Sequence, residues 1–393
     1  MDTRHAPTVD LALRFLDEWA GAPRPGPHAS DPGIPVLAHL VAGIAGPAAP
    51  ATAARAVAQW ARTAGRGPSH PGLYDGGLAG TLAGLRLGAR LHPGLHRAAD
   101  RLRDHLAGEA TAKTWRTADV AFPDYDLIVG PAGTLLALCV DATPTDRHLA
   151  HPVHHLAALC DGDELPRLRT GQYARHPHLS WVHGRVNTGM GHGVAGVVTA
   201  LTAAIRRTGP APGPVASLRR ATRWLVRQSY DDARSIRTWA GAGLDGPAPD
   251  GAHPNPRQAW CYGTPGVAWA LWDAADALGD RDAADWAAAA FTTLAERYDE
   301  EFHLFGDGPG DLLGLCHGAA GVLAVADAFD RHARLPAAAA LSARLTVHLR
   351  ERLPAALGAD WPPGLLTGAP GALSALLTAQ GASRAWLPCL GLR

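Results

Sequence analysis

The sequence predicts an all-α fold, an α/α toroid in which a ring of inner helices is enclosed by a ring of outer helices. A pair of glycines separated by two residues recurs six times, about 50 to 70 residues apart. Each pair opens a segment that is apolar on almost every face, and amphipathic segments lie between them. Such helix pairs close as a solenoid or as a ring, and the near-total apolarity of the first set favours the double-layered ring.

The inner helices are predicted to begin at the glycine pairs. These are Gly77/Gly80, Gly130/Gly133, Gly193/Gly196, Gly263/Gly266, Gly318/Gly321 and Gly368/Gly371. Proline lies inside three of the pairs, where a first helical turn tolerates it because that N–H has no partner within the helix. Small residues let the helix starts crowd together, and the backbone N–H groups would make this rim of the ring electropositive.

The outer helices are predicted in the amphipathic segments between the apolar ones. They are Ala49–Arg62, Leu95–Leu106, Ala216–Tyr230, Asp282–Asp299 and Pro336–Leu353. The segment Asp141–Arg185 is polar, rich in His and Pro, and without a clean 3.6-residue period. We therefore expect residues 1–393 to form one toroid domain, with a small irregular or strand-containing insertion at residues 141–185.

Composition narrows the class of protein. The 36 basic and 36 acidic residues balance, which argues against binding nucleic acid or an anionic membrane. No run of about 18 apolar residues is present to cross a membrane. Charged residues within the first 26 positions also interrupt any signal-peptide core. We expect a cytoplasmic protein, whose five cysteines, few and odd in number, are available for a metal or for catalysis.

The residues just before each glycine pair differ between repeats. His192, Tyr262 and His317 occupy one register in the third, fourth and fifth repeats, and Cys261 and Cys316 occupy the register before it. Consecutive repeats are neighbours in a ring, so we expect these side chains to converge on one rim.

Cys261, Cys316 and His317 form a candidate metal site. Two thiolates and an imidazole suit Zn²⁺, and three protein ligands leave the fourth tetrahedral position open, as in catalytic sites. A lone cysteine is more often a small buried hydrophobe, but two in one register beside a histidine favour the metal. A water in the open position would indicate a hydrolase. Two thiolate ligands favour instead a substrate thiol, held deprotonated and reactive.

Further side chains are candidates for the chemistry around this site. His192 could transfer a proton near neutral pH. Asp126 lies four residues before Gly130, one repeat earlier, and Arg257 lies four residues before Cys261, where it could hold a carbonyl or carboxylate oxygen. We interpret Cys139, Cys160 and Cys389 as structural, together with the histidines between His148 and His155.

Four strings carry a family resemblance. They are Tyr125–Gly133 (YDLIVGPAG), Gly189–Gly196 (GMGHGVAG), Trp260–Gly266 (WCYGTPG) and Leu315–Gly321 (LCHGAAG). Together they resemble the motifs of lanthionine synthetase C-like proteins, the LanC cyclases, and the resemblance covers essentially the whole chain. Any one glycine-rich string would be unspecific, whereas the combination is specific.

The resemblance implies an α/α toroid with one zinc ion per chain. LanC enzymes close thioether rings in class I lanthipeptides, where a cysteine thiol of a dehydrated precursor peptide adds to a dehydroalanine or dehydrobutyrine of the same peptide. The resemblance implies zinc ligands at Cys261, Cys316 and His317, an acid–base pair at His192 and Asp126, and flanking residues at Arg257, Trp260 and Tyr262. It also implies two partners, the precursor peptide and the dehydratase of the same pathway, and a self-closed ring favours a monomer.

Three alternatives stay open at this point. The first is a zinc protein of the same family that adds a small thiol such as glutathione to dehydroamino acids. The second is a non-catalytic peptide-binding scaffold, which has no physical need for an open metal site. The third is a glycosidase using Asp75 and Asp126 as its two carboxylates, which would leave Cys261, Cys316 and His317 unexplained.

Overall fold

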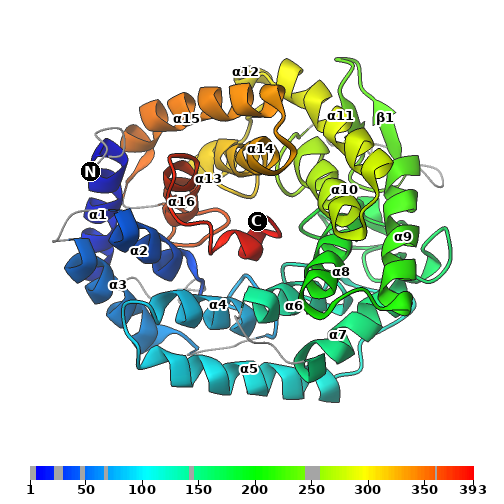
Figure 1. Cartoon of the computed structure of the whole chain (residues 1–393), viewed down its shortest axis with the longest axis horizontal. Coiled ribbons are helices and arrows are strands. Elements are labelled where there is room, and N and C mark those ends of the chain that lie inside the picture. Colours follow the sequence, from blue (N-terminus) through cyan, green and yellow to red (C-terminus); the bar gives the residue numbers. More distant parts are fainter. Residues whose placement is uncertain are drawn as a thin grey trace.

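Two concentric rings of helices make up the protein (Figure 1). The structure is a computed structural model that describes residues 6–21, 30–44, 49–65, 70–140, 146–243, 257–358 and 361–393. Inner and outer helices alternate along the chain, which confirms the predicted α/α toroid. Among the helices that the structure describes, none combines the length and the apolarity that crossing a bilayer would require.

The inner ring holds seven helices in the described part of the chain, one more than the glycine pairs predict. They are α2 (Gly33–Ile44), α4 (Leu78–Gly88), α6 (Pro131–Val140), α8 (Val194–Thr208), α10 (Thr264–Leu278), α14 (Ala319–Ala333) and α16 (Ala369–Ala379). Each packs against the next, and α16 packs against α2, which closes the ring. Helix α2 was not predicted, because it begins at Gly33 but carries Val36 where a second glycine would stand.

The second glycine of each pair is required by a close approach within its own repeat. At all six positions an added Cβ would overlap a carbonyl oxygen of the loop that leads into the helix; at Gly371 this is the oxygen of Leu365. The glycines therefore let each loop fold down onto the first turn of its helix. The crowding expected between neighbouring helix starts is present as well, since at all six positions the added Cβ would lie 2.7–3.3 Å from a side chain of the preceding repeat, as the one at Gly266 does from Met190 (2.9 Å).

We expect Gly371→Ala to destabilise the protein by about 2–3 kcal/mol, because the methyl group forces the Leu365 carbonyl away from the helix start. Gly108→Ala is the matched control. Gly108 lies on α5 (Leu95–Ala112) with nothing within 4 Å of an added Cβ, so alanine there should stabilise by about 0.5–1 kcal/mol. Thermal unfolding of both variants measures the difference, and equal melting temperatures would contradict the close approach.

The outer ring holds the amphipathic helices. They are α1 (Ala6–Gly21), α3 (Ala49–Thr63), α5 (Leu95–Ala112), α7 (Asp146–Leu159), α9 (Pro212–Arg227), α11 (Arg281–Arg297) and α15 (Pro336–Ala356). All five predicted outer helices are present, with ends that differ by a few residues. Tyr230, predicted to end one of them, instead lies in strand β1 (Ser229–Asp231), which pairs antiparallel with β2 (Arg237–Trp239).

The prediction of an irregular or strand-containing insertion at residues 141–185 is wrong for residues 146–159. Residues 146–159 form α7, which packs against α5, α6, α8 and α9 as an outer helix, while 141–145 lie outside the described residues. Pro152 and four histidines concealed its helical period. The rest is irregular, as expected, with short 3-10 helices η2 (Pro166–Leu168) and η3 (Ser180–Val182), and single bridges from Thr170 to Val120 and His183.

Backbone hydrogen bonds join neighbouring loops around the rim where the inner helices begin. We call this series the rim ladder: Leu73 N–H to Ile128 O (3.0 Å), Leu127 to Gly191 (3.1 Å), Met190 to Cys261 (2.8 Å), Cys261 to Cys316 (3.3 Å) and Cys316 to Leu366 (2.9 Å). The buried Asp31 carboxylate then accepts from Leu365 N (2.6 Å) and Gly33 N (2.9 Å), which ties the loop before α16 to α2. Burial raises the pKa of Asp31 to about 7.

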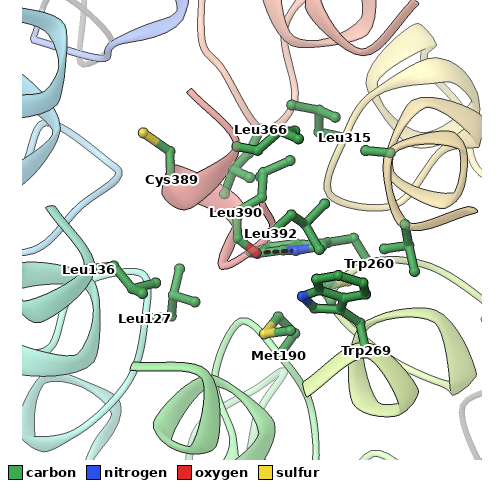
Figure 2. Close-up of a cluster of buried hydrophobic side chains, with 14 of the residues drawn as sticks. Leu127, Leu136, Met190, Trp260, Trp269, Leu315, Leu366, Cys389, Leu390 and Leu392 are labelled. Atoms are coloured by element: carbon green, nitrogen blue, oxygen red, sulfur yellow. Dashed lines mark hydrogen bonds between the residues drawn. The ribbon is translucent and has the colours of Figure 1, made fainter. Parts of the chain in front are cut away.

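The centre of the toroid is filled by the last residues of the chain. Figure 2 shows Leu390 and Leu392 surrounded by side chains of the inner ring, and η4 (Leu387–Leu390) lies against α6. Three ring side chains donate to backbone oxygens of this segment: Tyr74 to Cys389 (2.7 Å), Trp260 to Leu390 (2.9 Å) and Trp269 to Gly391 (2.9 Å). The toroid therefore has a solid core.

Candidate metal centre

The structure brings Cys261, Cys316 and His317 together at the rim. One ligand atom from each lies within 4.8 Å of the other two, and the described residues contain no other such group of three or more His, Cys, Asp or Glu. Cys261 is buried, and the other two are half-buried. All three precede the glycine pairs of α10 and α14, as the shared register predicts.

The rim ladder sets the spacing of the two cysteines. Cys261 N donates to Cys316 O at 3.3 Å, and Cys316 N donates to Leu366 O at 2.9 Å. The two thiols are thus positioned by the backbone of adjacent loops. Gly263, with φ of 81°, provides the left-handed turn between Cys261 and α10.

The donor set fits Zn²⁺. A hydrogen bond shared with Cys261 and burial raise the pKa of the Cys316 thiol, and a bound cation would favour its thiolate form. His317 Nδ1 lies 3.2 Å from Asp311 Oδ1. Because a carboxylate only accepts, the imidazole proton lies on Nδ1 and the lone pair on Nε2. Two soft sulfurs and one oriented imidazole are a suitable set of ligands for this metal.

His192 and Asp126 form a hydrogen-bonded pair. His192 Nδ1 lies 2.5 Å from Asp126 Oδ2, and Asp126 is fully buried. The other oxygen, Oδ1, accepts from the backbone N–H groups of Val129 (2.8 Å) and Gly130 (2.7 Å). Burial raises the pKa of Asp126, and the hydrogen bond from His192 opposes that rise. The imidazole stacks on Phe122 at 4.4 Å and remains one-third exposed, so Nε2 carries a lone pair on a fixed, accessible ring.

The loop that carries His192 lies directly on the metal-ligand loop. Met190 N donates to Cys261 O at 2.8 Å, and a Cβ on Gly191 would lie 3.7 Å from the Cβ of Cys261. Tyr262 is within electrostatic reach of both halves of the site: burial raises its pKa, and the charges of Cys261, Cys316 and Asp126 raise it further. The acid–base pair and the sulfur ligands therefore border one region of the rim.

The comparison with known families decides the relationship. The sequence model of lanthionine synthetase C-like proteins matches residues 47–390. The chain belongs to this family. A solved structure named nisin cyclase superposes with a TM-score of 0.79, covering 97% of this chain and 96% of that chain at 19% sequence identity, so the two share a fold. No curated protein sequence matches this LanC-like chain significantly.

Arg257 and Trp260, two of the residues predicted to flank the reaction centre of this LanC-like protein, have different surroundings. Arg257 stacks on the ring of Phe305 at 4.0 Å. The hydrogen bond with Cys316 raises the pKa of His317, and the charge of Arg257 opposes that rise. Trp260 is fully buried and donates to the Leu390 carbonyl at 2.9 Å, so its contacts anchor the central segment. A place for Trp260 beside the reacting atoms stays a prediction.

Asn187, which was not predicted from the sequence, contacts two residues of the LanC-like site. Its Nδ2 donates to the Tyr262 hydroxyl at 2.9 Å, and its Oδ1 accepts from Gly189 N at 2.8 Å. Because that hydroxyl accepts from Asn187, its own proton is available to a neighbour. The signal was weak, since Asn187 is a single polar residue at no repeated register.

The other candidate groups in this LanC-like protein are engaged elsewhere. Asp75 is exposed, whereas both oxygens of the buried Asp126 accept hydrogen bonds, which is a poor arrangement for a pair of glycosidase carboxylates. His155 bonds the Asp124 carbonyl at 2.7 Å. Burial raises the pKa of each remaining thiol, Cys139, Cys160 and Cys389, to about 12, as expected for structural cysteines.

Proposed function

We propose that this protein is a zinc-dependent cyclase that forms lanthionine and methyllanthionine rings. In this reaction a peptide cysteine adds, within the same peptide, to a dehydroalanine or dehydrobutyrine. The observation that carries the proposal is the Cys261, Cys316 and His317 group beside the His192–Asp126 pair on one rim. Membership of the LanC-like family supports it.

Cys261, Cys316 and His317 would hold the zinc ion, and the peptide cysteine would take the open fourth position. A zinc ion held by these residues would lower the pKa of the peptide thiol and so supply a deprotonated sulfur near neutral pH. Asp311 accepts the Nδ1 proton of His317, which fixes the orientation of the ring. The lone pair on Nε2 would then be available to bind the metal.

We expect Asp311→Ala to weaken zinc binding about 10- to 100-fold, because His317 loses the partner that orients its ring. Competition with a chromogenic chelator measures the affinity. Asp307→Ala is the matched control, since Asp307 is an exposed carboxylate in the same segment. Equal affinities in the two variants would contradict an orienting role for Asp311.

His192 Nε2 accepts the thiol proton and later returns it. The peptide sulfur forms a bond to Cβ of the dehydroamino acid, the C=C electron pair moves to Cα, and the proton on His192 ends on Cα. No atom is lost, so the product has the mass of the substrate. Asp126, bonded at Nδ1, keeps the lone pair on Nε2 and stabilises the imidazolium between the two transfers.

Negative charge that builds on the peptide carbonyl oxygen needs a positive or hydrogen-bonding partner. Arg257, whose charge reaches His317, and the Tyr262 hydroxyl are the groups that would supply it. We propose Trp260 as a positioning residue for the neighbouring Cys261, since its indole is fixed to the filled centre.

The partners follow from the reaction. The substrate is a dehydrated precursor peptide, prepared by a dehydratase of the same pathway. Consecutive rim loops of one chain assemble the whole site, so we propose that the protein acts as a monomer.

The test uses the purified full chain and a synthetic peptide with one dehydroalanine and one cysteine. We expect about one zinc per chain by elemental mass spectrometry. The peptide should lose its reactive thiol, measured with iodoacetamide, without a change of mass. A folded protein free of zinc would overturn the proposal. So would a peptide that gains the mass of glutathione when both thiols are offered, since the protein would then add small thiols.

A further inference from the structure

We propose that Phe302, Phe305 and Leu312 bind an apolar side chain of the substrate peptide, next to the cysteine that forms the ring. We call these three residues the rim patch. The inference rests on the proposed function and extends it, because it names a feature that the protein selects in its substrate.

The rim patch gathers most of the exposed large apolar surface. Among the described residues, four large hydrophobic side chains are exposed by a third or more: Phe302 (50%), Phe305 (37%), Leu312 (36%) and Val347 (49%). Three of them lie within one short segment between the outer helix α11 and the inner helix α14, which includes α12 (Glu300–His303) and α13 (Pro309–Leu313). Large apolar side chains that are exposed within one short segment of a protein surface indicate a binding surface.

The rim patch borders the candidate metal centre. Gly306, which follows Phe305, lies so close to Asp311 that an added Cβ would overlap the Asp311 side chain, and Asp311 bonds His317 at 3.2 Å. On the other side, a Cβ on Gly318 would lie 2.6 Å from the backbone of Leu312. Leu312 and the residue after Phe305 therefore lie beside the loop that carries two of the three metal-capable side chains, and Phe302 precedes them on the same segment.

Two arginines hold the aromatic rings in place. The Arg234 guanidinium lies 3.9 Å from the centre of the Phe302 ring. The Phe302 and His303 rings are perpendicular, with their centres 5.0 Å apart. Arg257, four residues before Cys261, lies 4.0 Å from the centre of the Phe305 ring. Rings fixed before binding lose little conformational entropy when a ligand covers them. Half-exposed rings held in this way are suited to a binding surface.

Geometry selects a residue next to the cysteine as the occupant. The peptide sulfur must reach Cys316 and His317, and an extended chain advances only about 3.3–3.6 Å per residue. One neighbour of that cysteine therefore crosses the His317 side of the centre, where the rim patch begins. The dehydroamino acid must instead lie toward His192, whose loop contacts Cys261. An aliphatic or aromatic neighbour buries apolar surface against the patch, whereas a small polar neighbour does not.

The experiment compares two peptides, each with one dehydroalanine and one cysteine, in which both neighbours of the cysteine are Leu or both are Ser. Wild-type protein should close the Leu peptide with a KM about tenfold lower, at similar kcat, as expected for one apolar side chain in a pocket. Phe302→Ala/Phe305→Ala should abolish this preference, so that the KM for the Leu peptide rises to the KM for the Ser peptide. Phe305→Leu, which stays apolar, should keep much of the preference.

Val347→Ala is the matched control. Val347 is as exposed as Phe302 but lies on the outer helix α15, so the preference for the Leu peptide should persist. Equal KM values for the two peptides in the wild type would overturn the rim patch and leave the cyclase standing. A change of oligomeric state in the double variant with unchanged KM values would also overturn it, since the patch would then cover a second copy.

A binding measurement separates the two proposals. Fluorescent peptides with Ser in place of dehydroalanine cannot react, so their binding reports the rim patch alone. If neither reactive peptide is closed by the wild type, the proposed function fails. Weaker binding of the Leu peptide by the double variant would still support the patch, and unchanged binding would overturn it.

Discussion

Cys316→Ala should remove the metal and stop ring closure. The substitution leaves one sulfur and one imidazole of the three-ligand group, too few to hold a zinc ion against water. We expect bound zinc to fall from about one per chain to a small fraction of that. Ring closure should fall to the rate of the peptide alone, because its thiol then keeps an ordinary pKa. Elemental mass spectrometry and the iodoacetamide assay measure both effects.

Cys139→Ala provides the comparison for that variant. Cys139 is a half-buried thiol at the end of α6, away from the candidate centre, and its replacement should leave zinc content and ring closure unchanged. Circular dichroism shows whether both variants fold. Full zinc occupancy in a folded Cys316→Ala protein would exclude the proposed ligand set.

The second large effect is expected at the His192–Asp126 pair. Asp126→Asn should lower kcat about 10²- to 10⁴-fold with zinc content unchanged, close to the effect of His192→Asn. The N–H groups of Val129 and Gly130 need an acceptor, so the oxygen of the side-chain amide introduced at position 126 faces them. The nitrogen of that amide then faces His192. It donates to Nδ1, which moves the imidazole proton to Nε2 and removes the lone pair there.

The assay is single-turnover ring closure at saturating peptide, with zinc measured on the same samples. Asp124→Asn is a suitable control, since Asp124 is a neighbouring carboxylate on η1 (Phe122–Asp124) that bonds backbone groups and not His192. If Asp126→Asn kept the wild-type kcat, the proton transfer assigned to His192 would have to be abandoned.

Repetition made the fold and the metal-capable group predictable. Each glycine pair is forced by a carbonyl oxygen against the helix start, so the same pattern returns in every repeat that folds this way. Cys261 and Cys316 share a register, and adjacent loops with one register become neighbours in a ring. The two cysteines can therefore be predicted to be neighbours without knowing the paths of the loops between the repeats.

The parts that escaped prediction depend on single, unrepeated contacts. Val36 breaks the glycine pattern, and α2 was lost with it. Asn187 and Asp311 act on Tyr262 and His317 through loop paths that occur once. The segment that fills the centre does not belong to the repeat pattern. Its backbone oxygens accept hydrogen bonds from side chains far away in the sequence, as the Leu390 oxygen does from Trp260.

The filled centre also has a topological consequence. Trp386, Leu390 and Leu392 are almost fully buried inside the inner ring, so no strand of peptide can be threaded through it. A peptide that reaches Cys316 arrives and departs on the same side of the protein. A peptide ring closed there by the proposed reaction would not be interlocked with the toroid, and its release would require no opening of either ring of helices. Small and large rings can leave by the same route.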